Sequence, residues 1–276
     1  CARKWKKPRG NRKRFTWQRM SENNPWLSYV RPNPHARLRL FCCHYAGGSA
    51  ALFRTWQGVL PQAVEVCPVQ LPGRENRIAE TSLTRLPEIA ARAATALRPM
   101  LDRPYAIFGH SMGALLGFEL ARQWRQAGAK SPAHVFVSGC RAPHTRGHLP
   151  STHQLPDEEF LAEVRSLNGT PAAIFEHPEL LQLLLPVLRA DFAAVQTYEY
   201  VAGPPLDCPM TALGGLADAQ VSRAQLADWQ AQTTRDFAVR MLPGDHFFLN
   251  TAQPLLLEMI GQQLRGMLAE RRDIDV

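Results

Sequence analysis

The sequence Gly109-His110-Ser111-Met112-Gly113 is the feature that most restricts the fold of this chain. An apolar run at 105–108 precedes it, and good helix formers at 114–125 follow it. A serine between two glycines at a strand-to-helix turn is typical of an exposed nucleophile. Such a turn crowds the positions two before and two after the serine, where only glycine leaves room. The helix that begins there directs free N–H groups at the same point, which favours an oxyanion. A glycine-rich helix start with a capping serine is the plainer alternative.

Short apolar runs alternate with helical patterns along most of the chain, which indicates βαβ units. We therefore expect an α/β fold with a mostly parallel central sheet and helices on both faces. The expected strands are 38–43, 64–70, 105–108, 134–138, 210–214 and 237–242. The expected helices of this alternation are 50–60, 86–101, 111–127, 222–233 and 254–268. Residues 35–276 would form this domain, behind an irregular tail at 1–34.

The alternation stops at about 147–205, where the sequence is mostly helical, with clear segments at 156–167 and 178–200. We expect an insertion that forms a lid over one edge of the sheet. Apolar residues at 181, 184, 188, 192 and 195 form one stripe on the second segment, which either packs against the body or lines a substrate channel. Pro186 should kink or interrupt that helix.

The formal net charge of +8 is confined to the start of the chain. Residues 1–19 hold nine basic residues and no acid, which leaves 23 basic and 24 acidic residues elsewhere. With Trp5, Phe15 and Trp17 interleaved, this tail would suit a nucleic-acid-binding protein, but the rest of the chain has no recognition motif. We expect no nucleic-acid partner. The first methionine is Met20, and we expect it to be the native start, with residues 1–19 as non-native sequence before it.

Membrane, secretory and metal-binding classes find no support in the sequence. No segment approaches the roughly 18 apolar residues of a membrane span, and no apolar stretch of a signal peptide follows the basic tail. The six cysteines show neither C-x-x-C pairs nor zinc spacing, and four lie in or beside apolar runs. This pattern points to a reducing cytoplasm. We expect no membrane contact, metal or cofactor.

A serine nucleophile needs a base, and an α/β sheet with this turn orders its catalytic residues as serine, acid, histidine. Among the histidines after Ser111, His246 alone follows the last expected strand and precedes the last helix. It would lie at the carboxyl edge of the sheet, where the serine turn also lies. We therefore predict His246 as the base.

The acid must orient that histidine and stabilise its charged form. Asp218 follows the expected strand at 210–214 and precedes His246, so it is the leading candidate. Asp245, Asp191 and Asp207 are weaker alternatives. The oxyanion hole needs two backbone N–H groups. We expect one from Met112 and the other from Ala46 or Gly47, in the loop after the strand at 38–43. A plain tight turn is the alternative reading of that loop.

Five strings taken together resemble the type II thioesterases of the α/β-hydrolase superfamily, which serve nonribosomal peptide and polyketide synthesis. They lie at 44–48, 70–75, 109–114, 184–192 and 244–248, and the likeness spans roughly 37–268. The resemblance implies an α/β-hydrolase fold and hydrolysis of acyl thioesters from the phosphopantetheine arm of an acyl or peptidyl carrier protein. It carries the catalytic roles to Ser111, Asp218 and His246 and implies a monomer.

Two features depart from the pattern of this family. Position 45 is tyrosine where a smaller residue is expected, so the oxyanion loop should be shaped differently, and the basic tail lies outside the likeness. The competing enzyme class is a general α/β-hydrolase carboxylesterase that acts on small free esters.

Overall fold

A parallel six-stranded sheet forms the centre of the computed structural model, which describes residues 24–147, 149–167, 169 and 175–270. The strands pair in the order β2-β1-β3-β4-β5-β6, and every pair is parallel. They are β1 (Leu38–Cys43), β2 (Val64–Pro68), β3 (Tyr105–His110), β4 (His134–Ser138), β5 (Met210–Gly215) and β6 (Phe237–Leu242). All six carboxyl ends therefore meet at one edge. The expectations for the tail at 1–19 and for Met20 lie outside the described residues.

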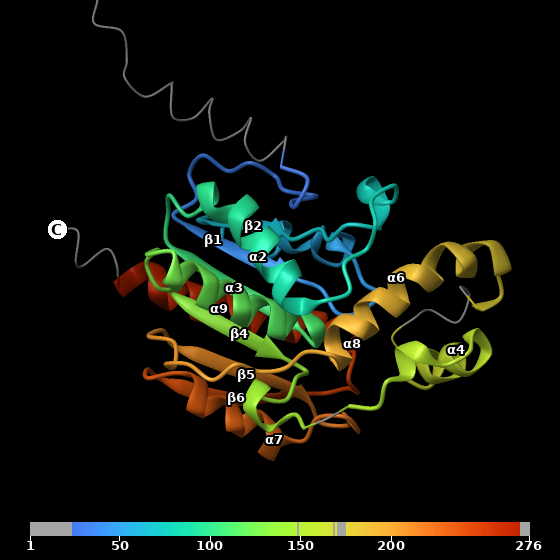
Figure 1. Ribbon diagram of the computed structural model, residues 1–276. Coiled ribbons are helices and arrows are strands. Elements are labelled where there is room, and N and C mark those ends of the chain that lie inside the picture. The colour runs from blue at the N-terminus through green and yellow to red at the C-terminus, as the bar shows by residue number, and fades with distance from the viewer. Residues whose placement is uncertain (1–23, 148, 168, 170–174, 271–276) are drawn as a thin grey trace, which may run out of the picture.

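Alternate strand residues face two different hydrophobic cores, as the two-residue period of a strand requires. On β1, Phe41 and Cys43 pack in the core that holds α2 (Leu86–Leu97) and α3 (Met112–Gln126). Leu40 and Cys42 pack in the core that holds α8 (Phe248–Thr251) and α9 (Gln253–Glu270). Figure 1 shows α2 and α3 on the near face and α9 behind the sheet. The predicted fold class is confirmed.

Several helix boundaries differ from the expectation. The segment 50–60 is not one helix but two short 3-10 helices, Ala50–Phe53 and Trp56–Gly58. Phe53 ends the first of these and Trp56 begins the second, and their rings pack edge to face at 4.9 Å. The segment 222–233 divides into α7 (Arg223–Ala227) and a 3-10 helix at Asp228–Gln232.

Between β4 and β5, the chain leaves the sheet and forms α4 (Asp157–Ser166) and α6 (Pro178–Gln196). We call this part the helical insertion; Figure 1 shows it beside the sheet edge. Phe160, Val164 and Leu188 give it a small core of its own. Pro186 was expected to kink or interrupt α6; an interruption is wrong, because the helix continues through the proline. The proline lies on the exposed side, where solvent can reach the carbonyl of residue 182 that lost its N–H partner.

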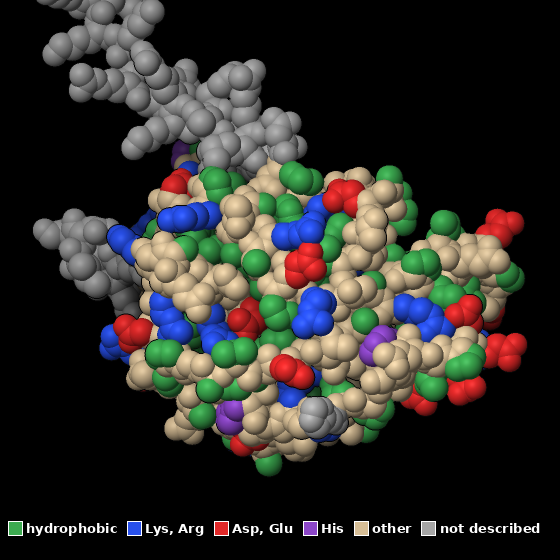
Figure 2. All heavy atoms as spheres, viewed as in Figure 1, with side chains coloured by type: hydrophobic (Ala, Val, Ile, Leu, Met, Phe, Trp, Pro, Cys, Tyr) green, Lys and Arg blue, Asp and Glu red, His purple; other side chains and the backbone are tan. Residues whose placement is uncertain are grey.

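Charge on the described surface agrees with a near-neutral body. Figure 2 shows basic and acidic side chains interspersed over the sheet and its helices, with acidic side chains gathered on the helical insertion. The first turn of α4 alone holds Asp157, Glu158 and Glu159. Among the residues that the structure describes, no helix is both long and apolar enough to cross a membrane.

Candidate active site

Ser111 lies on a sharp turn between β3 and α3, with φ 54° and ψ −114°. This conformation is strained for any residue with a side chain and typically costs about 1–3 kcal/mol. The two flanking glycines are required by close backbone approach. A Cβ on Gly109 would lie 2.0 Å from the carbonyl oxygen of Gly113, and a Cβ on Gly113 would lie 2.1 Å from that of Cys43. The sequence motif therefore reflects direct steric contact.

His246 and Asp218 are joined across the ends of β5 and β6. The Nδ1 of His246 donates to Oδ2 of Asp218 at 2.9 Å, and both side chains are buried. The other oxygen of Asp218 accepts the backbone N–H groups of Gln220 and Val221. Burial raises the pKa of Asp218, but the hydrogen bond and charge of His246 and the two amides outweigh it, so the pKa lies below its ordinary value. An ionised carboxylate accepts only, so the His246 proton resides on Nδ1 and leaves Nε2 as an acceptor.

The three alternative acids have other partners. Asp191 is buried and accepts hydrogen bonds from Arg74 and from the amide of Gly47. Asp207 lies before β5 and pairs with an exposed arginine. Asp245 accepts the amide of Phe247 beside it. Of the four candidates, the structure brings Asp218 to His246.

The loop after β1 lies against the start of α3. The amide of Gly47 donates to Asp191 at 2.7 Å, so it is not available to a substrate. The amides of Ala46 and Met112 have no hydrogen-bond acceptor among the described residues. Met112 begins α3, where the first N–H groups of a helix lack partners within it.

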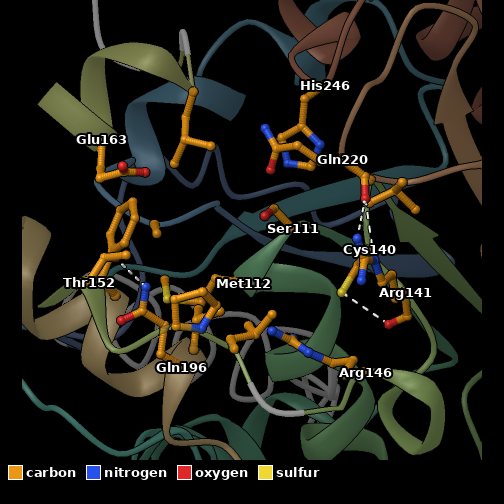
Figure 3. A pocket seen from close by; sticks show the side chains of 18 residues that line it. Ser111, Met112, Cys140, Arg141, Arg146, Thr152, Glu163, Gln196, Gln220 and His246 are labelled. Atoms are coloured by element: carbon orange, nitrogen blue, oxygen red, sulfur yellow. Dashed lines mark hydrogen bonds between the residues drawn. The ribbon is translucent and has the colours of Figure 1, made fainter.

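A cavity of about 300 Å³ opens over the serine, and both Ser111 and His246 line it. Figure 3 shows Ser111 near the middle of the pocket and His246 from the last strand loop above it. A smaller adjoining hollow of about 60 Å³ also includes Ala46, Ser111 and His246. The helical insertion forms part of the cavity wall, with Glu163 from α4 and Phe192 from α6. From the expected apolar stripe, positions 188, 192 and 195 line these hollows.

Sequence reasoning missed several polar residues at this site. Arg141, Arg146, Glu163 and Gln220 line the cavity, and no motif marked them. It also gave no role to Arg74 or to Asp191 beyond that of a weak acid candidate. The signal for Asp191 was available, since it is the only carboxylate between residues 180 and 196, where most of the residues are apolar.

Buried aromatic rings surround the catalytic histidine candidate. The ring of His110 lies 5.3 Å from that of His246, and its Nδ1 pairs with the hydroxyl of Ser138 at 2.8 Å. The unexpected Tyr45 is buried, and its ring packs against Phe247 at 5.0 Å and His110 at 5.9 Å. The tyrosine therefore fills space behind the oxyanion loop. Within the described residues, no cluster of potential ligands could hold a metal ion.

Residues 38–264 match the Thioesterase domain family. The gramicidin S biosynthesis protein GrsT of Aneurinibacillus migulanus is 46% identical over 252 residues, which cover 91% of this chain and 98% of GrsT.

Two solved structures are similar throughout. RedJ, a thioesterase from the prodiginine pathway of Streptomyces coelicolor, is 42% identical with a TM-score of 0.79, covering 84% of this chain and 92% of RedJ. The type II thioesterase BorB from the borrelidin biosynthetic cluster is 36% identical with a TM-score of 0.79, and the match covers 88% of this chain and 97% of BorB. The chain therefore belongs to the thioesterase family, as a type II thioesterase of nonribosomal peptide and polyketide pathways that hydrolyses thioesters.

Proposed function

We propose that this enzyme hydrolyses acyl thioesters from the phosphopantetheine arm of carrier proteins and so clears misprimed or stalled assembly lines. One observation carries the chemistry: Ser111 shares a cavity with His246, whose Nδ1 is held by Asp218. The carrier partner is supported by relatives such as ClbQ and the type II thioesterase YbtT, which are described as proteins of NRPS/PKS pathways. We expect a monomer that works in the cytoplasm, where the five described cysteines, all free and buried, would stay reduced.

In the proposed reaction, the hydroxyl oxygen of Ser111 attacks the thioester carbonyl carbon while Nε2 of His246 takes its proton. The negative charge moves to the carbonyl oxygen, which accepts hydrogen bonds from the amides of Ala46 and Met112. When this intermediate collapses, the C–S bond breaks and the sulfur leaves with the proton from His246. A thiol with a pKa near 8.5 is a good leaving group.

Water then completes the turnover. His246 removes a proton from water, which attacks the acyl-enzyme, and the bond to Ser111 breaks as its oxygen regains a proton. The products are the free acid and the enzyme. Asp218 remains ionised throughout and stabilises the charged imidazole of His246. The helical insertion acts as the lid, and Phe192 contacts the acyl chain.

The test compares one acyl group on three carriers: a phosphopantetheinyl carrier protein, free pantetheine and a simple alcohol. We expect the highest kcat/KM on the carrier protein, and no turnover above background by Ser111→Ala. Equal kcat/KM on the simple ester would favour the carboxylesterase instead. Full activity in folded Ser111→Ala would overturn the mechanism.

A further inference from the structure

A buried ion pair connects the helical insertion to the oxyanion loop. Asp191 on α6 is fully buried, and Arg74, from the loop after β2, is nearly so. The two terminal nitrogens of the Arg74 guanidinium group, Nη1 and Nη2, donate to the two carboxylate oxygens of Asp191 at 2.7 and 2.9 Å. The same arginine donates to the carbonyl of Gly48 at 3.1 Å. Such bidentate pairs are geometrically specific, so the pair fixes α6 against two loops.

Asp191 also holds one peptide of the oxyanion loop. The amide of Gly48 donates to the carbonyl of Tyr45 at 3.0 Å, and Gly47 between them has a φ of +78°, the features of a type II turn. The middle peptide of this turn lies between Ala46 and Gly47. Its plane can take two opposite orientations, one of which gives a type I turn and the other a type II turn. The 2.7 Å bond from Gly47 N to Asp191 selects one of them.

The packing of α6 leaves this turn little freedom. Leu188 stands one helical turn before Asp191 and approaches Gly47 so closely that a Cβ there would lie 2.5 Å from its Cδ2. The turn is thus enclosed by a side chain and fixed by a carboxylate from the same helix. The amide of Ala46, which the proposed function uses, belongs to the adjoining Tyr45–Ala46 peptide, so Asp191 acts on it through the backbone of the turn.

We propose that Asp191, held by Arg74, is a positioning residue that sets the orientation of the oxyanion loop and couples the helical insertion to the oxyanion hole. This inference rests on the proposed function. The pair is costly to bury, since replacing a buried ion pair with apolar side chains of similar volume is often neutral or stabilising. A role in stability alone therefore accounts poorly for it. A movement of α6 would carry Asp191 away and release the Ala46–Gly47 peptide.

The main test replaces the pair by apolar residues, in the double variant Asp191→Leu with Arg74→Met. It removes the acceptor for Gly47 without leaving one buried charge unpaired. We expect a folded protein with an unchanged KM and a kcat lowered about 10- to 100-fold, less than the loss of an oxyanion donor altogether. The second variant, Asp191→Asn with Arg74→Gln, keeps an acceptor for Gly47 and should retain kcat within about threefold.

Two inhibitors separate positioning from general damage. A trifluoromethyl ketone analogue of the substrate forms an oxyanion on the enzyme, whereas a thioether analogue does not. We expect the Ki of the ketone to rise in the apolar double variant in proportion to the loss of kcat/KM, with the Kd of the thioether unchanged. A parallel rise for both inhibitors would mean that the pair only shapes the pocket and would overturn the proposal.

A matched control is available on α3, where Arg122 and Glu119 form another largely buried pair at 2.8 Å. The variant Glu119→Leu with Arg122→Met should leave kcat and the ketone Ki unchanged. Wild-type kcat in the folded apolar variant of Asp191 and Arg74 would refute the positioning role. Hydrolysis by Ser111→Ala would instead refute the proposed function, so the two failures are distinguishable.

Discussion

Three buried histidines should make this enzyme sensitive to mild acid. Burial, and to a lesser extent the charge of Arg74, lowers the pKa of His44 from 6.5 to about 4. Burial alone lowers the pKa of His134 to about 4. Burial, and then the charge of the nearby His246, lowers the pKa of His110 well below its ordinary value. The unfolded chain binds protons at these residues below pH 6.5, whereas the folded protein does not, so stability is lost as the pH falls.

The size of this effect follows from the shifts. At pH 7.5 all three histidines are neutral in both states and contribute almost nothing. A pH of 5 is about 1.5 units below the ordinary pKa of histidine, so His44 and His134 each cost about 2 kcal/mol there, since one pKa unit is worth about 1.4 kcal/mol. Together these two histidines remove about 4 kcal/mol, and His110 acts in the same direction, whereas the whole stability of many proteins is about 5–15 kcal/mol.

The assay is urea unfolding of the wild type and of His134→Gln at pH 7.5 and pH 5. This histidine is distant from the catalytic candidates, and its Nε2 pairs with the hydroxyl of Thr211 at 2.9 Å, which a glutamine amide can replace. The stability difference at pH 7.5 measures lost packing. When the pH is lowered from 7.5 to 5, the unfolding free energy of the variant should rise relative to that of the wild type by about 2 kcal/mol. An identical difference at both pH values would refute the reasoning. Carboxylates do not affect this comparison, because they contribute equally to both proteins and cancel in the difference.

Three further predictions concern the site. Asp218→Asn should keep the fold but lower kcat by about 10⁴, because His246 loses the acceptor that fixes its tautomer; steady-state kinetics and circular dichroism check this. Gly113→Ala should cost at least about 1–3 kcal/mol and lower Tm by several degrees, since its Cβ would meet the Cys43 carbonyl, whereas Gly58→Ala, with open space around it, should leave Tm unchanged. Phe192→Ala should enlarge the cavity, and kcat/KM over a series of acyl carriers should shift toward longer chains.

The parts of the fold that the sequence predicted well depend on local patterns. The strands Leu38–Cys43, His134–Ser138 and Phe237–Leu242 have the expected bounds, because each is a short, mostly apolar run bounded by polar or turn residues. Asp218 and His246 each follow the end of a predicted strand, and this predicted their position at the carboxyl edge of the sheet. The expected parallel sheet was enough for this, because the carboxyl ends of parallel strands meet at one edge, whereas the order of the strands comes from the structure.

The parts that sequence reasoning missed depend on distant contacts. Gly47 and Asp191 are 144 residues apart, and no local pattern indicates that one accepts a hydrogen bond from the other. The choice between the amides of Ala46 and Gly47 was open for that reason. The uninterrupted α6 is a similar case, because the cost of Pro186 depends on which face of the helix meets solvent.

The distance between the proposed acid, Asp218, and the proposed base, His246, is set by backbone contacts beyond the ends of β5 and β6. The amide of Leu216 donates to the carbonyl of Leu242 at 2.8 Å, and that of Ala217 to Gly244 at 2.9 Å, so the pairing continues into both loops. A Cβ on Gly215 would lie 2.2 Å from the carbonyl of Asp245. The loops that carry the acid and the base therefore pack backbone to backbone.

The nucleophile is connected to this pair through β4. The amide of Ser111 donates to the carbonyl of Ser138 at 2.8 Å, and the amide of Gly139 donates to Leu213 on β5, also at 2.8 Å. Backbone hydrogen bonds thus link Ser111 to β4, β4 to β5, and the end of β5 to the end of β6, from which the loop with His246 leaves. The oxyanion loop, in contrast, also depends on contacts from the helical insertion, above all that of Gly47 with Asp191. The backbone of the sheet therefore sets the spacing of the proposed nucleophile, acid and base, whereas α6 sets the conformation of the oxyanion loop.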